Sequence, residues 1–271
     1  MGKIIGIYGV QRGLGTTTIG QSLAKVIGES NSKVLYLELD YLNATFAHKT
    51  SISNPERNME LFMEKAILEG RFDIQKYILK KNEVGEGKRF SWLPSNMELL
   101  TFSNDFAEES FPRFKTNVET LVEKFSNDFI SKLKALDYDY VILQLPNQIE
   151  NVFGLPMLSK CDSVVSILTG NPIVLSRYKN ITNVFEKANL QPKEWVHVFN
   201  LCSNKIDEED YKMLVDFEVT ACIPYDPERA EIEFSLQLGS ETIDEYMKNI
   251  ARKLGCFIRN EQNGFRLFKS K

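Results

Sequence analysis

The chain has few of the residues that bind transition metals. Its 271 residues include two histidines and four cysteines, and no two cysteines form a CxxC pair. Structural zinc sites need clustered cysteine and histidine ligands, so this sequence predicts none. Scattered cysteines are also typical of a reducing compartment, because disulfides persist in oxidising ones. We therefore expect a cytoplasmic protein without a zinc site.

The sequence also lacks a positive net charge and any long apolar run. Lysine and arginine number 33 against 37 aspartate and glutamate, which gives a net charge of −4 and a pI of about 5.5. This balance gives no electrostatic reason to expect nucleic acid as a partner. No segment is long and apolar enough to span a bilayer, and we expect the amino terminus to enter the first strand without a secretory signal.

A glycine-rich loop, Gly9–Thr18, lies between an apolar strand predicted over residues 3–8 and an amphipathic helix. Gly13 and Gly15 allow backbone amides to converge on one point, and the helix start adds the positive end of its dipole. We predict that this loop binds phosphate, with the Thr17 hydroxyl on a bound Mg²⁺. The alternative is a tight strand-to-helix turn that binds nothing.

The loop lacks one residue of the usual phosphate-loop pattern. That pattern places a lysine before the hydroxyl residue, whereas this chain has Gly15-Thr16-Thr17. The lysine would reach the β- and γ-phosphates, and each lost charge-assisted hydrogen bond costs roughly 1.5–3 kcal/mol. The amide cradle remains, so we expect weakened nucleotide binding, and no nucleotide at all is the alternative.

Apolar runs separated by amphipathic segments predict the fold class. Strands are predicted over 3–8, 34–39, 89–94, 98–102, 139–146, 163–168, 195–199 and 220–223. Helices are predicted over 19–27, 58–68, 73–80, 117–135, 172–187 and 241–254, with a flexible loop over 83–88. Strands that alternate with helices form a mostly parallel sheet covered on both faces. We predict one α/β, doubly wound domain over residues 1–271.

These motifs, in their order and spacing, resemble the MinD/ParA group of deviant phosphate-loop ATPases. Aligning the glycines puts Gln11 where the group has a dimer-crossing lysine, and Thr16 where it has the phosphate lysine. The strand over 139–146 resembles the group's Walker B strand, with Gln144 in place of the acid on the magnesium side. Asp40, at the end of the second strand, matches an aspartate that helps to position the attacking water. Its alternative role is a strand-end cap.

The resemblance implies a site for ATP or ADP with Mg²⁺, and Asp40 is its candidate catalytic residue. It also implies contacts to the adenine from Asn200 and from the strand-to-loop segment that contains Pro224 and Asp226. Arg12 would supply a cation to the loop or across a homodimer, unless it is simply solvated. The expected nucleotide-binding residues are Gln11, Arg12, Gly13, Leu14, Gly15, Thr16, Thr17, Thr18, Asn200, Pro224 and Asp226.

Within this group the chain is most similar to the CpaE/TadZ branch, the placement factors of Flp-type pili. The run Gln11–Thr18 and the dipeptide Leu145-Pro146 carry that likeness. The branch usually has an additional receiver-like domain before the loop and tends to keep the acid that Gln144 replaces. We expect neither feature in this chain.

The missing charges predict a degenerate ATPase that acts as a scaffold or localisation factor, with pilus or secretion machinery as its setting. The alternative is a slow but active switch, with Asp40 positioning water and Thr17 on magnesium. A DNA-partitioning role is disfavoured by the acidic pI. The expected partners are proteins of a membrane-associated machine. Phenylalanines among basic residues in the tail, 256–271, suggest a peripheral membrane or partner contact, and packing onto the core is the alternative.

Overall fold

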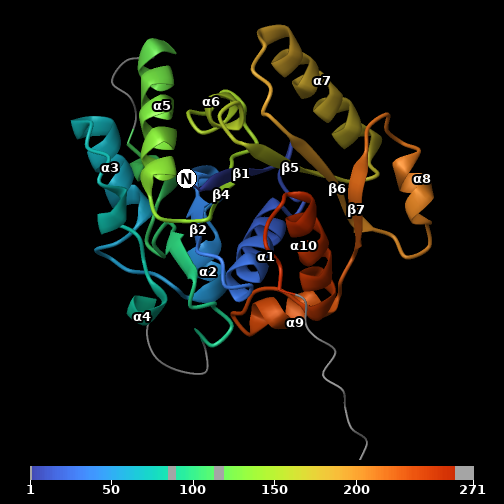
Figure 1. The fold of residues 1–271 in the computed structure, drawn as a ribbon, viewed down its shortest axis with the longest axis horizontal. Helices are drawn as coiled ribbons and strands as arrows, with labels where there is room; N and C mark the ends of the chain where they lie inside the picture. Colours follow the sequence, from blue (N-terminus) through green and yellow to red (C-terminus); the bar gives the residue numbers. More distant parts are fainter. Residues whose placement is uncertain (1, 85–89, 113–118, 260–271) are drawn as a thin grey trace, which may run out of the picture.

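The computed structural model describes residues 2–84, 90–112 and 119–259, and these ranges form a seven-stranded sheet (Figure 1). The strands are β1 (Lys3–Tyr8), β2 (Val34–Glu38), β3 (Met97–Leu100), β4 (Tyr140–Gln144), β5 (Ser163–Leu168), β6 (Trp195–Cys202) and β7 (Val219–Pro224). Their order in the sheet is β3-β2-β4-β1-β5-β6-β7, and neighbouring strands pair in parallel. The predicted α/β fold with a parallel sheet is confirmed.

Helices cover this sheet from both sides (Figure 1). Within the described ranges they are α1 (Thr16–Glu29), α2 (Phe46–Thr50), α3 (Met59–Glu69), α4 (Lys81–Val84), α5 (Glu119–Ala135), α6 (Leu155–Leu158), α7 (Pro172–Ala188), α8 (Glu208–Lys212), α9 (Glu228–Phe234) and α10 (Glu241–Lys253). No helix in this part of the chain has both the length and the apolar character needed to cross a membrane.

The sheet order places β1 at the point where the chain changes direction. β1 pairs with β4 on one side and β5 on the other, so the chain leaves this centre in opposite directions. Since βαβ crossovers are right-handed, opposite directions put α1 and α7 on opposite faces, as Figure 1 shows. Ligands of open α/β sheets bind at such a switch point, outside the carboxyl ends of the strands.

The central strands are buried on both faces, which explains their nearly continuous apolar sequences. Every residue of β2 and β5 is buried, as are five of the six residues of β1. Parallel strands covered by helices on both sides show this pattern, because neither face contacts water. The same pattern made these strands predictable from the sequence.

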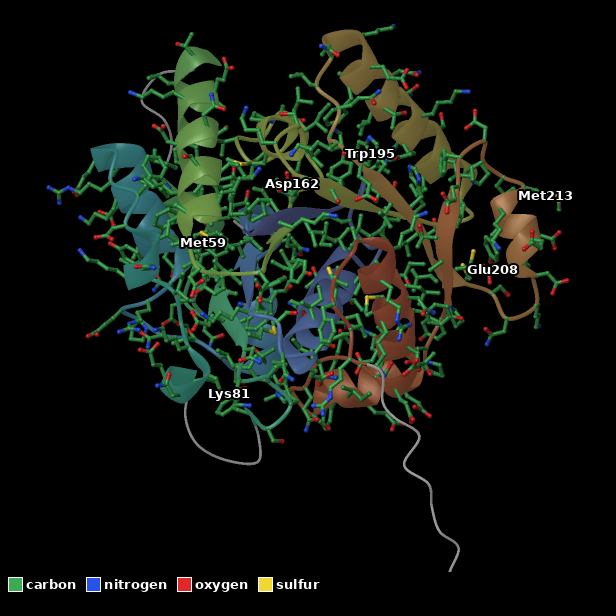
Figure 2. The ribbon with its side chains drawn as sticks, in the orientation of Figure 1. Met59, Lys81, Asp162, Trp195, Glu208 and Met213 are labelled. Carbon is green, nitrogen blue, oxygen red and sulfur yellow. The ribbon has the colours of Figure 1, made fainter. Side chains whose placement is uncertain are left out.

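Asp162, labelled in Figure 2, links several elements at the amino edge of the sheet, just before β5. Its Oδ2 accepts a hydrogen bond from the backbone N–H of Ile4 at 3.0 Å, and its Oδ1 pairs with Lys134 at 3.2 Å and Lys193 at 2.6 Å. Burial raises the pKa of this carboxyl, but these donors outweigh that effect, and the pKa is lowered overall. One carboxylate therefore joins β1, α5 and the start of β6.

The strand predicted over 89–94 is wrong for residues 90–94, and residue 89 lies outside the described residues. Residues 90–93 form a turn, in which the N–H of Leu93 donates to the carbonyl of Phe90 at 3.2 Å. Pro94 follows without an N–H to add to a ladder, and its carbonyl accepts from Met97 at 3.2 Å. The aromatic side chains suggested a strand, but they pack partly buried against the core from a turn.

The helix predicted over 73–80 is also wrong for most of its length. Only Ile74–Lys76 forms a short 3₁₀ turn, because Leu79 instead bridges Leu99 of β3 in antiparallel fashion. Two backbone hydrogen bonds of 2.8 and 3.0 Å join these leucines. Of the loop predicted over 83–88, the first two residues end α4 and the rest lie outside the described residues.

Candidate functional site

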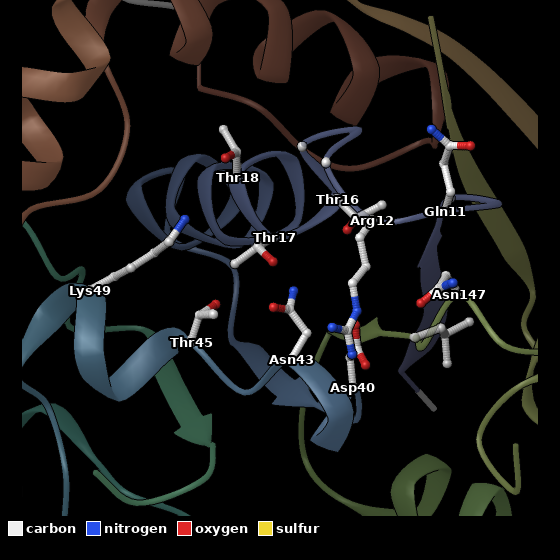
Figure 3. Close-up of a pocket in the computed structure, with 14 residues that line it drawn as sticks. Gln11, Arg12, Thr16, Thr17, Thr18, Asp40, Asn43, Thr45, Lys49 and Asn147 are labelled. Carbon is white, nitrogen blue, oxygen red and sulfur yellow. The ribbon is translucent and has the colours of Figure 1, made fainter. Parts of the chain in front are cut away.

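A cavity of about 280 Å³ lies beside the glycine-rich loop, at the carboxyl edge of the sheet (Figure 3). Its walls come from the segments that follow β1, β2 and β4 and from the first turn of α1. The lining residues are Gly9, Gln11, Arg12, Gly13, Gly15, Thr16, Thr17, Thr18, Asp40, Asn43, Thr45, Lys49, Leu145 and Asn147. Segments far apart in sequence therefore meet at the carboxyl edge of the sheet.

Gly15 has a backbone conformation that the loop requires and that other residues rarely adopt. It precedes α1 with φ of +88°, and an added Cβ would lie 2.2 Å from Nδ2 of Asn200. Because Gly15 offers no side chain to cap the helix, the N–H groups of the first turn of α1 keep no side-chain acceptor at that position. Such a helix start, beside a cavity, is suited to an anion.

Asn200, near the end of β6, holds the glycine-rich loop by a side-chain hydrogen bond. Its Nδ2 donates to the backbone carbonyl of Leu14 at 2.8 Å, and the residue is buried. The residue does not line the cavity, and neither does Leu14. The structure thus shows Asn200 holding the loop, while its predicted contact with an adenine stays a prediction.

A buried chain of neutral groups lies beneath Thr17. Nε2 of Gln144 donates to Oγ1 of Thr17 at 2.8 Å, and the hydroxyl of Tyr36 hydrogen-bonds to Oε1 of Gln144. All three residues are buried. The position expected to hold an acid therefore holds an amide that is engaged at both ends. Thr17 keeps a second oxygen lone pair for a ligand, and the group bonded to its hydroxyl, the Gln144 amide, is uncharged.

Asp40 faces the cavity as a buried carboxyl with an altered pKa. Burial raises its pKa to about 6, and the nearby guanidinium of Arg12 opposes that rise. Its Oδ1 is buried and has no hydrogen-bond partner among the described residues. The same holds for Oγ1 of Thr45 and Oδ1 of Asn147, which also line the cavity. Three buried oxygens without hydrogen-bond partners in the described ranges indicate a binding place for water or a ligand.

These oxygens fit a hydrated Mg²⁺ better than a caged metal. No group of three or more His, Cys, Asp or Glu side chains in the described ranges is arranged to hold a metal by itself. Mg²⁺ usually keeps several waters and takes one or two protein ligands plus phosphate oxygens. A single hydroxyl from Thr17, with Asp40 and Asn147 accepting from waters, matches that pattern.

Glu38 organises the segment that carries Asp40 and Asn43 to the site. Its carboxylate accepts backbone N–H bonds from Thr45 at 2.7 Å, Phe46 at 2.9 Å and Phe102 at 3.3 Å. Two of these donors stand at the start of α2, so Glu38 caps that short helix from the end of β2. Burial raises the pKa of Glu38 to about 7, against the opposing effect of these hydrogen bonds.

We expect the stability of the protein to fall as pH rises from 5 to 8, with Glu38 as a principal cause. The folded chain keeps the Glu38 proton up to about pH 7, whereas the unfolded chain releases it near its ordinary pKa of 4.5. Raising the pH therefore favours unfolding, by roughly 2–3 kcal/mol over this range. Urea unfolding at several pH values measures this, and Glu38→Gln should flatten the profile. An unchanged slope in that variant would contradict the assignment.

Gln11 and Arg12 make contacts within the chain. Oε1 of Gln11 accepts from Arg177 of α7 at 2.7 Å, and Arg12 donates to the carbonyl of Leu42 at 2.6 Å. Both residues line the cavity, although the side chain of Gln11, at the position of the group's dimer-crossing lysine, bonds to α7 here. Arg12 is exposed, so its charge can also reach a ligand.

The structure does not bring Pro224 and Asp226 to the cavity. Pro224 ends β7 opposite Cys202, and the carboxylate of Asp226 accepts from the N–H of Glu228 and the hydroxyl of Ser240. Asp226 thereby joins the starts of α9 and α10. The predicted contact of Pro224 and Asp226 with an adenine therefore requires a ligand that extends beyond the cavity.

Several cavity residues were not predicted as site residues. They are Asn43, Thr45, Lys49, Leu145 and Asn147, whereas Gly9 belongs to the loop predicted to bind phosphate. Asn43, Thr45 and Asn147 follow the ends of β2 and β4, so their place after strand ends was an available signal. Lys49 had no such signal, because it lies on a five-residue helix without a sequence signature.

The chain was compared with known families and structures. The profile of the AAA_31 family, described as an AAA domain, matches residues 2–197. No curated protein matches the sequence. Among solved structures, MinD of Pyrococcus horikoshii in complex with Mg-ADP is similar, with a TM-score of 0.71 and 16% identity over 96% of this chain and 100% of that one.

Two further solved structures share the fold. A plasmid partition protein of Borrelia burgdorferi bound to AMPPNP has a TM-score of 0.73 and 17% identity over 94% of this chain and 99% of that one. MinD in a MinC:MinD complex of Aquifex aeolicus has a TM-score of 0.69 and 17% identity, with coverages of 96% and 99%. At these identities the likeness shows the fold, and the family match spans most of the chain. The chain belongs to the AAA_31 family of AAA domains and has the P-loop fold of MinD.

Proposed function

We propose that this protein binds ATP or ADP with Mg²⁺ at the Gly9–Thr18 loop and hydrolyses ATP weakly or not at all. The observation that carries the proposal is the uncharged amide of Gln144, which donates a hydrogen bond to Thr17 at 2.8 Å from the position where an acid is expected. The loop keeps its glycines, its open helix start and its hydroxyl. It lacks charge at Thr16 and at Gln144, where a phosphate-transferring site would have it.

Each part of the cavity has a place in this proposal. The amides of residues 13–18 would hold the phosphates, and Thr17 would hold Mg²⁺. When bound, Mg²⁺ supplies the positive charge that neutralises the phosphates. Asp40, with a pKa of about 6, is mostly ionised at neutral pH and can accept a proton from a nearby water. It can therefore orient water even where turnover is slow.

A measurement of ATP turnover with excess Mg²⁺ tests this proposal. Phosphoryl transfer depends on positioning and charge neutralisation, so we expect the uncharged Thr16 and Gln144 to leave turnover well below about 1 per second. Asp40→Asn is the matched variant, since it removes the charge and keeps the shape. Turnover at or above that rate would contradict the degenerate-site proposal.

The second candidate function is a slow but active ATP switch, which the buried Asp40 favours. In that case Asp40→Asn should lower the remaining turnover by roughly 10²-fold, as expected for losing a group that positions water or accepts its proton. If the remaining turnover is instead the same in this variant, it does not come from the site, and the scaffold function is favoured.

The proposed partners are a second copy of the chain and proteins of a membrane-associated machine. A MinC:MinD complex in the same fold, and the loop likeness to CpaE/TadZ, support a localisation role with pilus or secretion components. Light scattering with and without AMPPNP measures the homodimer, and an unchanged monomer mass would argue against it. Of the tail proposed for partner or membrane contact, 256–271, residues 260–271 lie outside the described residues. Liposome sedimentation after deletion of residues 264–271 tests that contact.

A further inference from the structure

The cavity contains a lysine that the loop itself does not provide. Lys49 lies on α2 and lines the cavity with the loop residues. Figure 3 shows its side chain extending from α2 toward Thr17 and Thr18 in the first turn of α1. That turn is where the phosphates of a nucleotide would lie under the proposed function. A positive charge therefore reaches the phosphate region from a segment some 30 residues beyond the loop.

Lys49 now pairs with Glu233, and this ion pair can be broken at little cost. Its Nζ lies 3.2 Å from Oε1 of Glu233 on α9, and the two side chains are 28% and 33% exposed. The same oxygen also accepts from Arg229 at 2.8 and 3.1 Å. Glu233 would therefore keep a cationic partner if Lys49 moved away. Partly exposed ion pairs contribute little stability, so breaking this one costs little.

The other cation of the cavity is already engaged. Of the lining residues, Arg12 and Lys49 are those with positive charge. Arg12 donates to the carbonyl of Leu42, and its charge opposes the rise in the pKa of Asp40. Moving Arg12 to a phosphate would leave the buried carboxyl of Asp40 without that stabilisation, whereas moving Lys49 leaves Glu233 with Arg229. Lys49 is thus the more available of the two.

We propose that Lys49 replaces the absent loop lysine and contacts the terminal phosphates of a bound nucleoside di- or triphosphate. Binding exchanges the ion pair with Glu233 for a charge-assisted hydrogen bond to phosphate. The inference rests on the proposed function, because it assigns a residue to that same nucleotide site. It also accounts for how a loop with Thr16 can hold a polyphosphate.

Calorimetric titration of the full chain with AMPPNP and Mg²⁺ tests this assignment. Lys49→Met should weaken binding by roughly 10- to 100-fold, the effect of losing one charge-assisted hydrogen bond. Glu233→Gln should tighten binding, since Lys49 no longer has to leave a carboxylate. Lys65→Met is the matched control, because Lys65 pairs with Glu69 on α3 and does not line the cavity. It should bind as the unaltered chain does.

The double variant Thr16→Lys with Lys49→Met provides the rescue. A lysine restored to the loop should recover the affinity that Lys49→Met loses, while a folding defect would not be recovered. Equal affinities of the unaltered chain and Lys49→Met would overturn the inference alone, as would weaker binding by Glu233→Gln. No binding by either the unaltered chain or Thr16→Lys would overturn the proposed function and this inference with it.

Discussion

Replacing Thr16 by lysine and Gln144 by aspartate should convert this protein into a faster ATPase. The lysine restores a charge on the transferring phosphate, and the aspartate places a carboxylate behind Thr17, where the neutral amide of Gln144 now donates at 2.8 Å. Single preorganised groups of this kind are worth about 10²- to 10³-fold in turnover. We expect the double variant to gain at least that factor over the unaltered chain, measured as phosphate release with excess Mg²⁺.

The two single variants separate binding from chemistry. Thr16→Lys alone should tighten nucleotide binding, and Gln144→Asp alone should make binding and turnover more dependent on Mg²⁺. Gln144→Asp also adds a third buried carboxyl near Glu38 and Asp40, and the shorter side chain draws its oxygen away from the Tyr36 hydroxyl. Without Mg²⁺ it should therefore lower the thermal stability. A double variant no faster than the unaltered chain would show that the two charges are not what limits hydrolysis.

Among substitutions that add one methyl group to the loop, Gly15→Ala should lower the free energy of unfolding the most. Gly15 has φ of +88°, and a Cβ would lie 2.2 Å from Nδ2 of Asn200. The positive φ costs about 1–2 kcal/mol for an L-residue, and displacing Asn200 removes its buried bond to Leu14, so the total loss is about 3–4 kcal/mol. Chemical denaturation measures this loss, and nucleotide binding should disappear with it.

Gly13→Ala is the matched control for that variant. Gly13 has a similar φ of +82°, but nothing lies within 4 Å of an added Cβ. It should therefore show the backbone cost of about 1–2 kcal/mol without the collision. Equal losses in the two variants would mean that Asn200 does not hold the loop.

The parallel sheet was predictable because its strands are buried on both faces. Residues 34–39 contain one charged residue and residues 163–168 two serines, the rest being apolar or aromatic, and the structure places β2 and β5 there. The aromatic residues of 89–94 also favoured a strand. A turn forms there instead, because Pro94 has no N–H and the N–H of Leu93 donates to the carbonyl of Phe90. Local turn formation outweighed the strand preference of the aromatic residues at that point.

The candidate site was predictable only where a residue belongs to a local pattern. Thr17 and Gln144 could be placed together because each follows or ends a strand of one parallel sheet. Lys49 could not, because its approach to the loop depends on how Glu38 caps a five-residue helix. The contact of Asn200 with Leu14 joins residues 186 positions apart, and no local spacing reports such a pair.

The most direct test of the account is a calorimetric titration of the unaltered chain with ADP, in the presence and absence of Mg²⁺. The open helix start, the positive φ of Gly15 and the Oδ1 of Asp40, which has no partner in the described part of the chain, predict a single site that Mg²⁺ strengthens. Because the loop lysine is absent, we expect a dissociation constant between about 1 μM and 1 mM. No heat of binding for ADP or ATP at millimolar concentrations would contradict the account.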